Sequence, residues 1–205
     1  MNIWILAAAF LAFTISAWLT RRFCDPLSRL HLLDHPNERS LHSQPTPRTG
    51  GVAILAGAFS VLPVWANISG DMASVLWLSL GTLIVAAFSF FDDRHGLSAS
   101  ARLLGHFVGA GFIVIGAGLG LPPIFQQSWT GIGLSMFFLV WMVNLYNFMD
   151  GMDGFAGGMT LIGFATLGVF GWLAGNMPFL VMSLGLAAAA AGFLLFNFQI
   201  GRAHV

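Results

Sequence analysis

Two adjacent aspartates, Asp92 and Asp93, follow a long apolar stretch of this sequence and begin the segment DDRHGLSASAR. Neighbouring residues on a helix point about 100° apart, so the two carboxylates should take different roles. A divalent cation relieves the repulsion between such carboxylates, and Mg²⁺ in proteins commonly binds one or two carboxylates together with phosphate oxygens. The pair therefore predicts a catalytic metal site. The alternative is a solvated helix end at which a carboxylate pairs with Arg94.

A second polar segment, NLYNFMDGMDGFAGG, places amides and carboxylates three residues apart, at Asn144, Asn147, Asp150 and Asp153. Because several glycines follow Met149, an unbroken helix through the segment is disfavoured. We expect a helix that ends near Met149, followed by a turn that brings oxygen atoms and backbone N–H groups toward one point. Such a group can coordinate a metal or bind a nucleobase and ribose. The alternative is an ordinary polar loop.

A third polar segment, LDHPNERSLHSQPTPRTGG, precedes the other two and shows no helical periodicity. Its prolines stiffen the backbone and remove hydrogen-bond donors, which predicts a fixed loop. His42 and Arg48 are candidates for contacts with a phosphate, since a guanidinium presents paired donors to phosphate oxygens. The alternative is that the arginines of this loop only orient the chain in a membrane.

The elements that must position these segments are long and apolar. Hydrophobic residues make up 57% of the chain and charged residues 8%, whereas a soluble domain carries roughly 25% charged residues. A soluble domain is therefore excluded. Because a helix needs about 20 apolar residues to cross a bilayer, the sequence predicts an all-α, polytopic transmembrane helix bundle. The expected spans are residues 1–20, 50–68, 73–91, 103–120, 131–148, 158–174 and 178–198.

Arginine placement orients the predicted bundle. Every arginine falls on one side if the spans alternate in direction, and the connections on the other side, 69–72, 121–130 and 175–177, contain none. The positive-inside rule makes the arginine side cytoplasmic, which puts the N-terminus outside. The acidic residues follow the same pattern, and only Asp71 faces outward. The polar chemistry is thus expected at the cytoplasmic face.

This asymmetry separates two classes of function. A transporter more often holds polar groups near the bilayer midplane, whereas His106 is the one ionisable residue well inside a predicted span. We therefore favour an enzyme that works at the membrane surface over a cation-coupled transporter. Gly105 and Gly109 form a small-xxx-small pair, which predicts close helix packing rather than a site.

At this point the three polar segments resemble one family, the polyprenyl-phosphate N-acetylhexosamine-1-phosphate transferases. The resemblance covers the chain to about Phe198, with all three segments in order and in register. It implies transfer of a sugar-1-phosphate from a UDP-N-acetylhexosamine to undecaprenyl phosphate, with release of UMP, in the bacterial inner (cytoplasmic) membrane. The wording PRTGG is more similar to the O-antigen-initiating branch than to the peptidoglycan branch.

The resemblance also implies roles for individual residues. The family's acidic pair maps onto Asp92 and Asp93, and its dependence on Mg²⁺, with Mn²⁺ as an alternative, implies that this pair and Asp150 hold the metal. The expected partners are the UDP-sugar, undecaprenyl phosphate and membrane lipid but not nucleic acid, and a homodimer is left open. The residues expected to bind substrate are His42, Arg48, Arg102, Asn147, Asp150, Asp153 and Asn197.

The end of the chain departs from the family's pattern. The family continues after Asn197 with a further aspartate that binds metal and a histidine-rich loop, so we expect residues 1–198 to be the N-terminal portion of a transmembrane transferase domain. We expect residues 199–205 to be a non-native tail, because the common sequencing-adapter string ATCGGAAGAGCACACGTC translates to Ile200–Val205. A chain that ends here should be inactive by itself.

Overall fold

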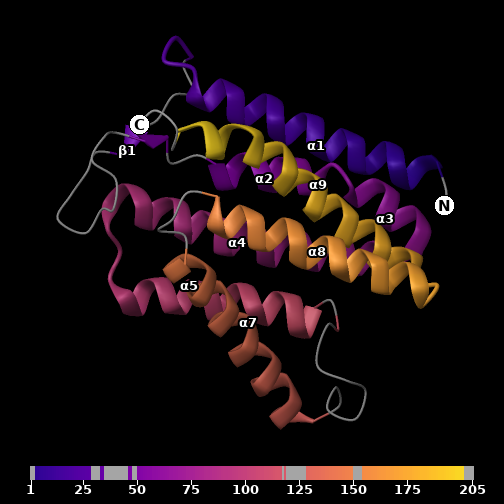
Figure 1. The fold of residues 1–205 in the computed structure, drawn as a ribbon. Coiled ribbons are helices and arrows are strands. Elements are labelled where there is room, and N and C mark those ends of the chain that lie inside the picture. The colour runs from indigo at the N-terminus through magenta and orange to yellow at the C-terminus, as the bar shows by residue number, and fades with distance from the viewer. Residues whose placement is uncertain are drawn as a thin grey trace. The chain divides into compact units, whose positions relative to one another are not determined.

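A computed structural model describes residues 3–28, 33–34, 46–47, 50–116, 118, 128–149 and 154–200 of the protein. The chain forms two compact units, whose helices are labelled in Figure 1. Unit 1 comprises Met1–Gly70 and Met149–Val205, and unit 2 comprises Asp71–Phe148. The all-α fold class is confirmed, with one small addition: β1 (Leu33–Asp34) and β2 (Thr46–Pro47) form a short antiparallel pair in the first polar segment.

Unit 1 is held together by close contacts of α9 with its neighbours. Its helices are α1 (Ile3–Cys24), α2 (Gly50–Phe59), α3 (Leu62–Ser69), α8 (Phe155–Leu173) and α9 (Met177–Ile200). The indigo α1 and yellow α9 of Figure 1 approach at Gly192, where an added Cβ would lie 2.4 Å from the carbonyl oxygen of Phe13. Small residues permit such backbone contact between membrane helices.

Pairs of residues along α9 give the direction of the surrounding helices. Gly50 at the start of α2 lies against the ring of Phe193, and Gly157 at the start of α8 lies against Leu194. At the other end, Ile5 of α1 shares a buried cluster with Leu180. Therefore α1 runs parallel to α9, whereas α2 and α8 run antiparallel to it, which is the alternation that the predicted spans require.

The second predicted span is divided into two helices in the structure, which corrects the single helix expected over 50–68. Pro63 has no N–H to donate, and its ring clashes with the carbonyl four residues earlier, so it interrupts a helix. The backbone tightens there, with the N–H of Val61 donating to the carbonyl of Ala58 at 3.2 Å. The α3 helix then begins at Leu62 and ends at Ser69, before Gly70 in the left-handed conformation.

Unit 2 contains α4 (Met72–His95), α5 (Ala99–Gly111), the π-helical turn η1 (Phe112–Gly116) and α7 (Trp129–Met149). Asp71 caps the start of α4, and its carboxylate accepts a hydrogen bond from the N–H of Ser74 at 3.0 Å. The Ser74 hydroxyl also donates to this carboxylate, and these bonds hold the pKa of Asp71 below its ordinary value.

The glycines of unit 2 bring α4 and α5 into backbone contact. A Cβ on Gly81 would lie 2.6 Å from the carbonyl oxygen of Gly109, and a Cβ on Gly105 would lie 2.3 Å from the ring of Phe88. The predicted packing role of Gly105 and Gly109 is thus confirmed. The two helices form an antiparallel hairpin, and the acidic pair lies in the last turn of α4, next to the connection.

Seven segments of the described residues are long and apolar enough to cross a membrane, each close to a predicted span. Many of their large apolar side chains are exposed, among them Trp4, Phe10, Leu76, Trp129 and Ile162. Soluble proteins rarely expose extended apolar surfaces, so this exposure suits a lipid environment. The protein is a multi-pass membrane protein.

Candidate active site

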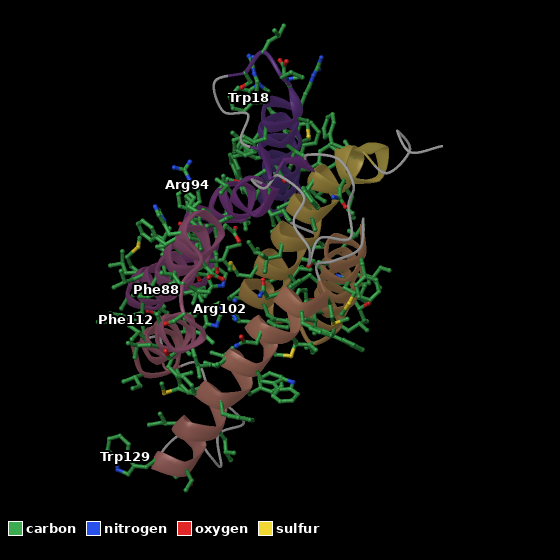
Figure 2. All side chains as sticks on the ribbon, turned by 90° about the vertical axis from the view of Figure 1, so that its left-hand side faces the viewer. Trp18, Phe88, Arg94, Arg102, Phe112 and Trp129 are labelled. Atoms are coloured by element: carbon green, nitrogen blue, oxygen red, sulfur yellow. The ribbon has the colours of Figure 1, made fainter. Side chains whose placement is uncertain are left out.

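The connection between α4 and α5 brings Asp92 and Arg102 together. Arg102 Nη1 donates to Asp92 Oδ2 at 2.9 Å, and the Arg102 and Asp92 side chains are 33% and 19% exposed. Ions that are partly withdrawn from water interact more strongly than ions on an open surface. Asp92 therefore pairs with Arg102 and not with Arg94, whose guanidinium lies 4.7 Å from the ring centroid of Phe90. Figure 2 shows Arg94 projecting away from the ribbon, apart from Arg102.

The turn that joins the two helices is also built around Asp92. Its backbone carbonyl accepts from the N–H of Gly96 at 2.8 Å, and its Oδ1 accepts from the N–H of Leu97 at 2.9 Å. Gly96 has a φ of 65°, a left-handed conformation that favours glycine. Ser98 then caps α5 by accepting from the N–H of Ala101. The Asp92 side chain thus closes the turn and also binds Arg102 of the next helix.

The acidic pair occupies two environments, as expected for neighbours on a helix. Asp92 is half-buried in the turn, whereas Asp93 is exposed. No group of three or more His, Cys, Asp or Glu side chains suited to a metal lies within the described ranges. Two carboxylates still suit Mg²⁺, which completes its shell with water and phosphate oxygens. Each Asp92 oxygen accepts one hydrogen bond, and a carboxylate oxygen has a second lone pair, so the donor chemistry fits a divalent cation.

A buried polar contact lies one helical turn beyond Arg102. His106, which is 2% exposed, lies on α5, and its Nδ1 is 3.3 Å from Nδ2 of Asn144 on α7. Asn144 Nδ2 also donates to the carbonyl of Val140 at 2.8 Å. Asn147 follows one turn later on α7 and is exposed. The described helix extends to Met149, and the turn predicted after it lies outside the described residues.

Asn197, a predicted substrate-binding residue, makes a contact within unit 1. Its Oδ1 accepts from the backbone N–H of Gly154 at 2.5 Å. Gly154 has a φ of 72° and precedes the first residue of α8. Asn197 therefore fixes the point at which the second polar segment enters α8. Four predicted site residues lie outside the described residues, and their roles stay predictions: His42, Arg48, Asp150 and Asp153.

Sequence reasoning did not identify the contact between His106 and Asn144. It assigned His106 to the transporter alternative and Asn144 to the polar repeat, without connecting them. The spacing did contain a signal, because His106 follows Arg102 by four residues and Asn147 follows Asn144 by three. Residues so spaced share a helix face, so His106 lies on the same face as Arg102, and Asn144 lies on the same face as Asn147.

Comparison with known proteins identifies the family. The model of Glycosyl transferase family 4 matches residues 75–205, more than half of the chain. The chain belongs to this family. The matched region of this family 4 member covers most of α4 and all of α5 and α7, and therefore the Asp92–Arg102 pair.

Several curated relatives are similar to this family 4 member over most of its length. A probable undecaprenyl-phosphate N-acetylglucosaminyl 1-phosphate transferase of Bacillus subtilis is 28% identical over 83% of this chain and 49% of its own length. A decaprenyl-phosphate N-acetylglucosaminephosphotransferase of Mycobacterium leprae is 32% identical, with 84% and 49% covered. An undecaprenyl-phosphate alpha-N-acetylglucosaminyl 1-phosphate transferase of Escherichia coli is 27% identical, with 95% and 54% covered. The chain spans about half the length of these relatives.

Proposed function

We propose that the protein of which this chain is part transfers N-acetylhexosamine-1-phosphate from a UDP-sugar to undecaprenyl phosphate and releases UMP. A phosphate oxygen of the lipid forms a new bond to the sugar-bearing phosphorus, and the bond between that phosphorus and the oxygen of UMP breaks. The observation that supports this proposal is the Asp92–Arg102 pair, which lies within the family match at the end of an apolar hairpin. The names of the relatives point to the same chemistry.

The pair suits a reaction between two phosphates. Arg102 offers N–H donors in a planar fork, the geometry that phosphate oxygens accept best. Its contact with Asp92 at 2.9 Å orients that fork before substrate arrives. Asp92 and Asp93 would hold Mg²⁺ together with Asp150, and the ion would supply charge neutralisation for the diphosphate and the departing UMP. Which aspartate positions the lipid phosphate is left open.

The remaining predicted residues complete the proposal for the substrates. Asn147, Asp150, Asp153 and Asn197 would bind the nucleoside and the sugar, while His42 and Arg48 would contact phosphate. The UDP-sugar would approach from the cytoplasm and the lipid phosphate from the inner membrane. The product would initiate O-antigen or another cell-envelope polysaccharide. The relatives described above offer no support for the transporter alternative.

The test uses a gene recovered from the source DNA through its own stop codon. Membranes that contain the protein are incubated with undecaprenyl phosphate, Mg²⁺ and radiolabelled UDP-sugars. UDP-N-acetylglucosamine comes first, because N-acetylglucosamine occurs in the names of the relatives described. UDP-N-acetylgalactosamine and the 6-deoxy sugars UDP-N-acetylfucosamine and UDP-N-acetylquinovosamine follow. We expect label in the lipid phase that depends on Mg²⁺.

The control is the double variant Asp92→Asn, Asp93→Asn. Asparagine keeps an oxygen that can accept the N–H of Leu97, so the turn should fold, while the carboxylate charge is lost. We expect no lipid-linked label from this variant. If folded wild-type protein transfers none of the sugars, the transferase proposal is wrong.

A further inference from the structure

The contact between His106 and Asn144 has no role in the chemistry proposed above, although it joins two helices of unit 2. Burying polar groups in an apolar bundle costs free energy unless they are hydrogen-bonded. His106 is 2% exposed, so its ring does not reach a substrate, and it lies 38 residues from Asn144 in the sequence. A polar contact maintained at such a depth requires an explanation.

The hydrogen bonds around Asn144 assign the orientation of both side chains. The carbonyl of Val140 can only accept, so the atom of Asn144 that lies 2.8 Å from it is the NH₂ nitrogen. The second hydrogen of that NH₂ group is then directed to Nδ1 of His106. Nδ1 therefore acts as an acceptor, and the ring proton resides on Nε2. The bond is directional and defines a single arrangement of the two side chains.

This arrangement lies directly below two residues of the candidate site. Residues three or four apart on a helix share a face, so His106 lies beneath Arg102 on α5, and Asn144 lies beneath Asn147 on α7. Further along the same pair of helices, Met136 approaches Gly111, where an added Cβ would be 3.5 Å from the methionine Cε. That contact is apolar and non-directional. The His106–Asn144 bond is directional, so it can set the rotation and axial position of α7 against α5 where the apolar contact does not.

We propose that His106 is a positioning residue for the transfer reaction. It acts through Asn144 to align Asn147 with Arg102, so that both residues can contact the same bound UDP-sugar. The inference rests on the function proposed above. Asn147 would bind the nucleoside of the UDP-sugar and Arg102 its phosphates, so a shift between α5 and α7 separates two contacts to the same molecule. The lipid acceptor needs only one of these contacts and should be less affected.

The test compares His106→Leu, Asn144→Leu and the double variant in the full-length protein. A misplacement of about 1 Å can cost about a hundredfold in rate, and we expect a loss of that order in kcat/KM for the UDP-sugar. The KM for undecaprenyl phosphate should stay near the wild-type value. Because both changes break one bond, the double variant should lose no more than either single variant.

A matched control and a rescue separate positioning from general damage. Thr82→Val removes a half-buried hydroxyl that donates to the Leu78 carbonyl of its own helix at 2.8 Å, and it should leave both kinetic constants unchanged. His106→Asn places an amide oxygen near the position of Nδ1 and should recover donor kinetics. His106→Gln carries its amide further out and should not. If a leucine variant fails to reach the membrane, the comparison of His106→Asn with His106→Gln tests the same proposal.

The outcomes distinguish the inference from the function on which it rests. Normal donor kinetics in the leucine variants, or equal donor kinetics in His106→Asn and His106→Gln, would overturn the positioning role and leave the transferase intact. Equal losses for the donor and the acceptor would overturn it as well. An inactive wild-type protein would instead refute the transferase proposal, and the role of His106 in transfer with it.

Discussion

Each unit contains an antiparallel helix hairpin with a polar contact near one end, and the two contacts differ in kind. In unit 2, α4 and α5 are joined by the ion pair of Asp92 and Arg102, ten residues apart, at the connecting turn. In unit 1, α8 and α9 are joined at their open end by the neutral bond between Asn197 and the N–H of Gly154, 43 residues apart. The first contact joins two charged side chains, and the second fixes the backbone at Gly154.

Glycines lie at close approaches in both hairpins, and the closer backbone approach is in the hairpin of unit 2. In the α4–α5 hairpin, Gly81 and Gly109 bring backbone against backbone. In the α8–α9 hairpin, Gly157 and Gly168 lie against leucine side chains, and Gly171 lies against backbone, with an added Cβ 3.0 Å from the nitrogen of Leu180. A rigid backbone contact positions a charged pair precisely, because neither helix can slide without a clash. Unit 2 therefore holds a charged pair at its hairpin, whereas unit 1 holds the backbone at the start of α8.

Loss of the charged contact should give the largest effect. Arg102→Leu removes the donors that face Asp92, and loss of one preorganised electrostatic group typically costs about 10²–10³-fold in kcat. Arg102→Lys keeps the charge without the fork and should fall between wild type and Arg102→Leu. The measurement is the rate of lipid-linked label at saturating substrate.

Arg94→Leu is the matched control for this prediction. Its guanidinium lies over Phe90, away from the ion pair, and a surface substitution usually changes free energies by less than about 0.5 kcal/mol. Its activity should remain close to that of the wild type. An equal loss in Arg94→Leu and Arg102→Leu would show that positive charge at this face matters in general, and not the ion pair.

Filling the backbone contact tests the rigidity of the α4–α5 hairpin. A Cβ at Gly81 would lie 2.6 Å from the Gly109 carbonyl oxygen, and such overpacking costs about 1–3 kcal/mol. Gly81→Ala should therefore lower the unfolding temperature in detergent. Gly133→Ala in α7 meets nothing within 4 Å and should be neutral or stabilising, since alanine is the better helix former. Equal stabilities of the two variants would contradict the close packing.

Loss of the neutral contact should have a smaller and more structural effect. Asn197→Leu leaves the N–H of Gly154 without its acceptor, and an unsatisfied buried donor costs about 1–3 kcal/mol. Asn197→Asp keeps an oxygen at the same position and should retain most of the stability. Limited proteolysis near residue 154 measures the effect locally. Cleavage that is equally slow in all three proteins would show that the bond does not hold this segment.

The smallest expected effect concerns Asp71, which lies outside the spans. The hydrogen bonds from Ser74 lower its folded-state pKa below the ordinary 3.8. A carboxylate with a lowered pKa stabilises the fold above its unfolded-state value, and this stabilisation is lost as the pH falls through the folded-state value. The stability difference between wild type and Asp71→Ala should thus be present at neutral pH and shrink below about pH 3.8. A difference that does not change with pH would exclude the carboxylate as its source.

Much of the fold followed from local sequence features. Apolar runs of bilayer length defined all seven spans because a membrane leaves few alternatives to a helix. The described part of α7 extends to Met149, near which the sequence predicted its end, and the spacing of Gly105 and Gly109 predicted close packing. The helix break at Pro63 was not predicted, although a proline within an apolar run is itself a signal for such a break. The prediction of one unbroken helix over 50–68 used the hydropathy of the segment and did not consider that Pro63 lacks an N–H.

The candidate site was also predicted in part from the sequence and in part only from the structure. The sequence by itself determined which residue types gather at the polar ends of the helices, and it placed Asp92 and Arg102 within one short connection, where chain continuity keeps them near each other. Only the tertiary structure decided that Asp92 pairs with Arg102, that Asn197 holds Gly154, and that His106 meets Asn144. The physical reason is that helix periodicity specifies the face on which a residue lies, whereas its partner across 38 or 43 residues depends on how the helices pack.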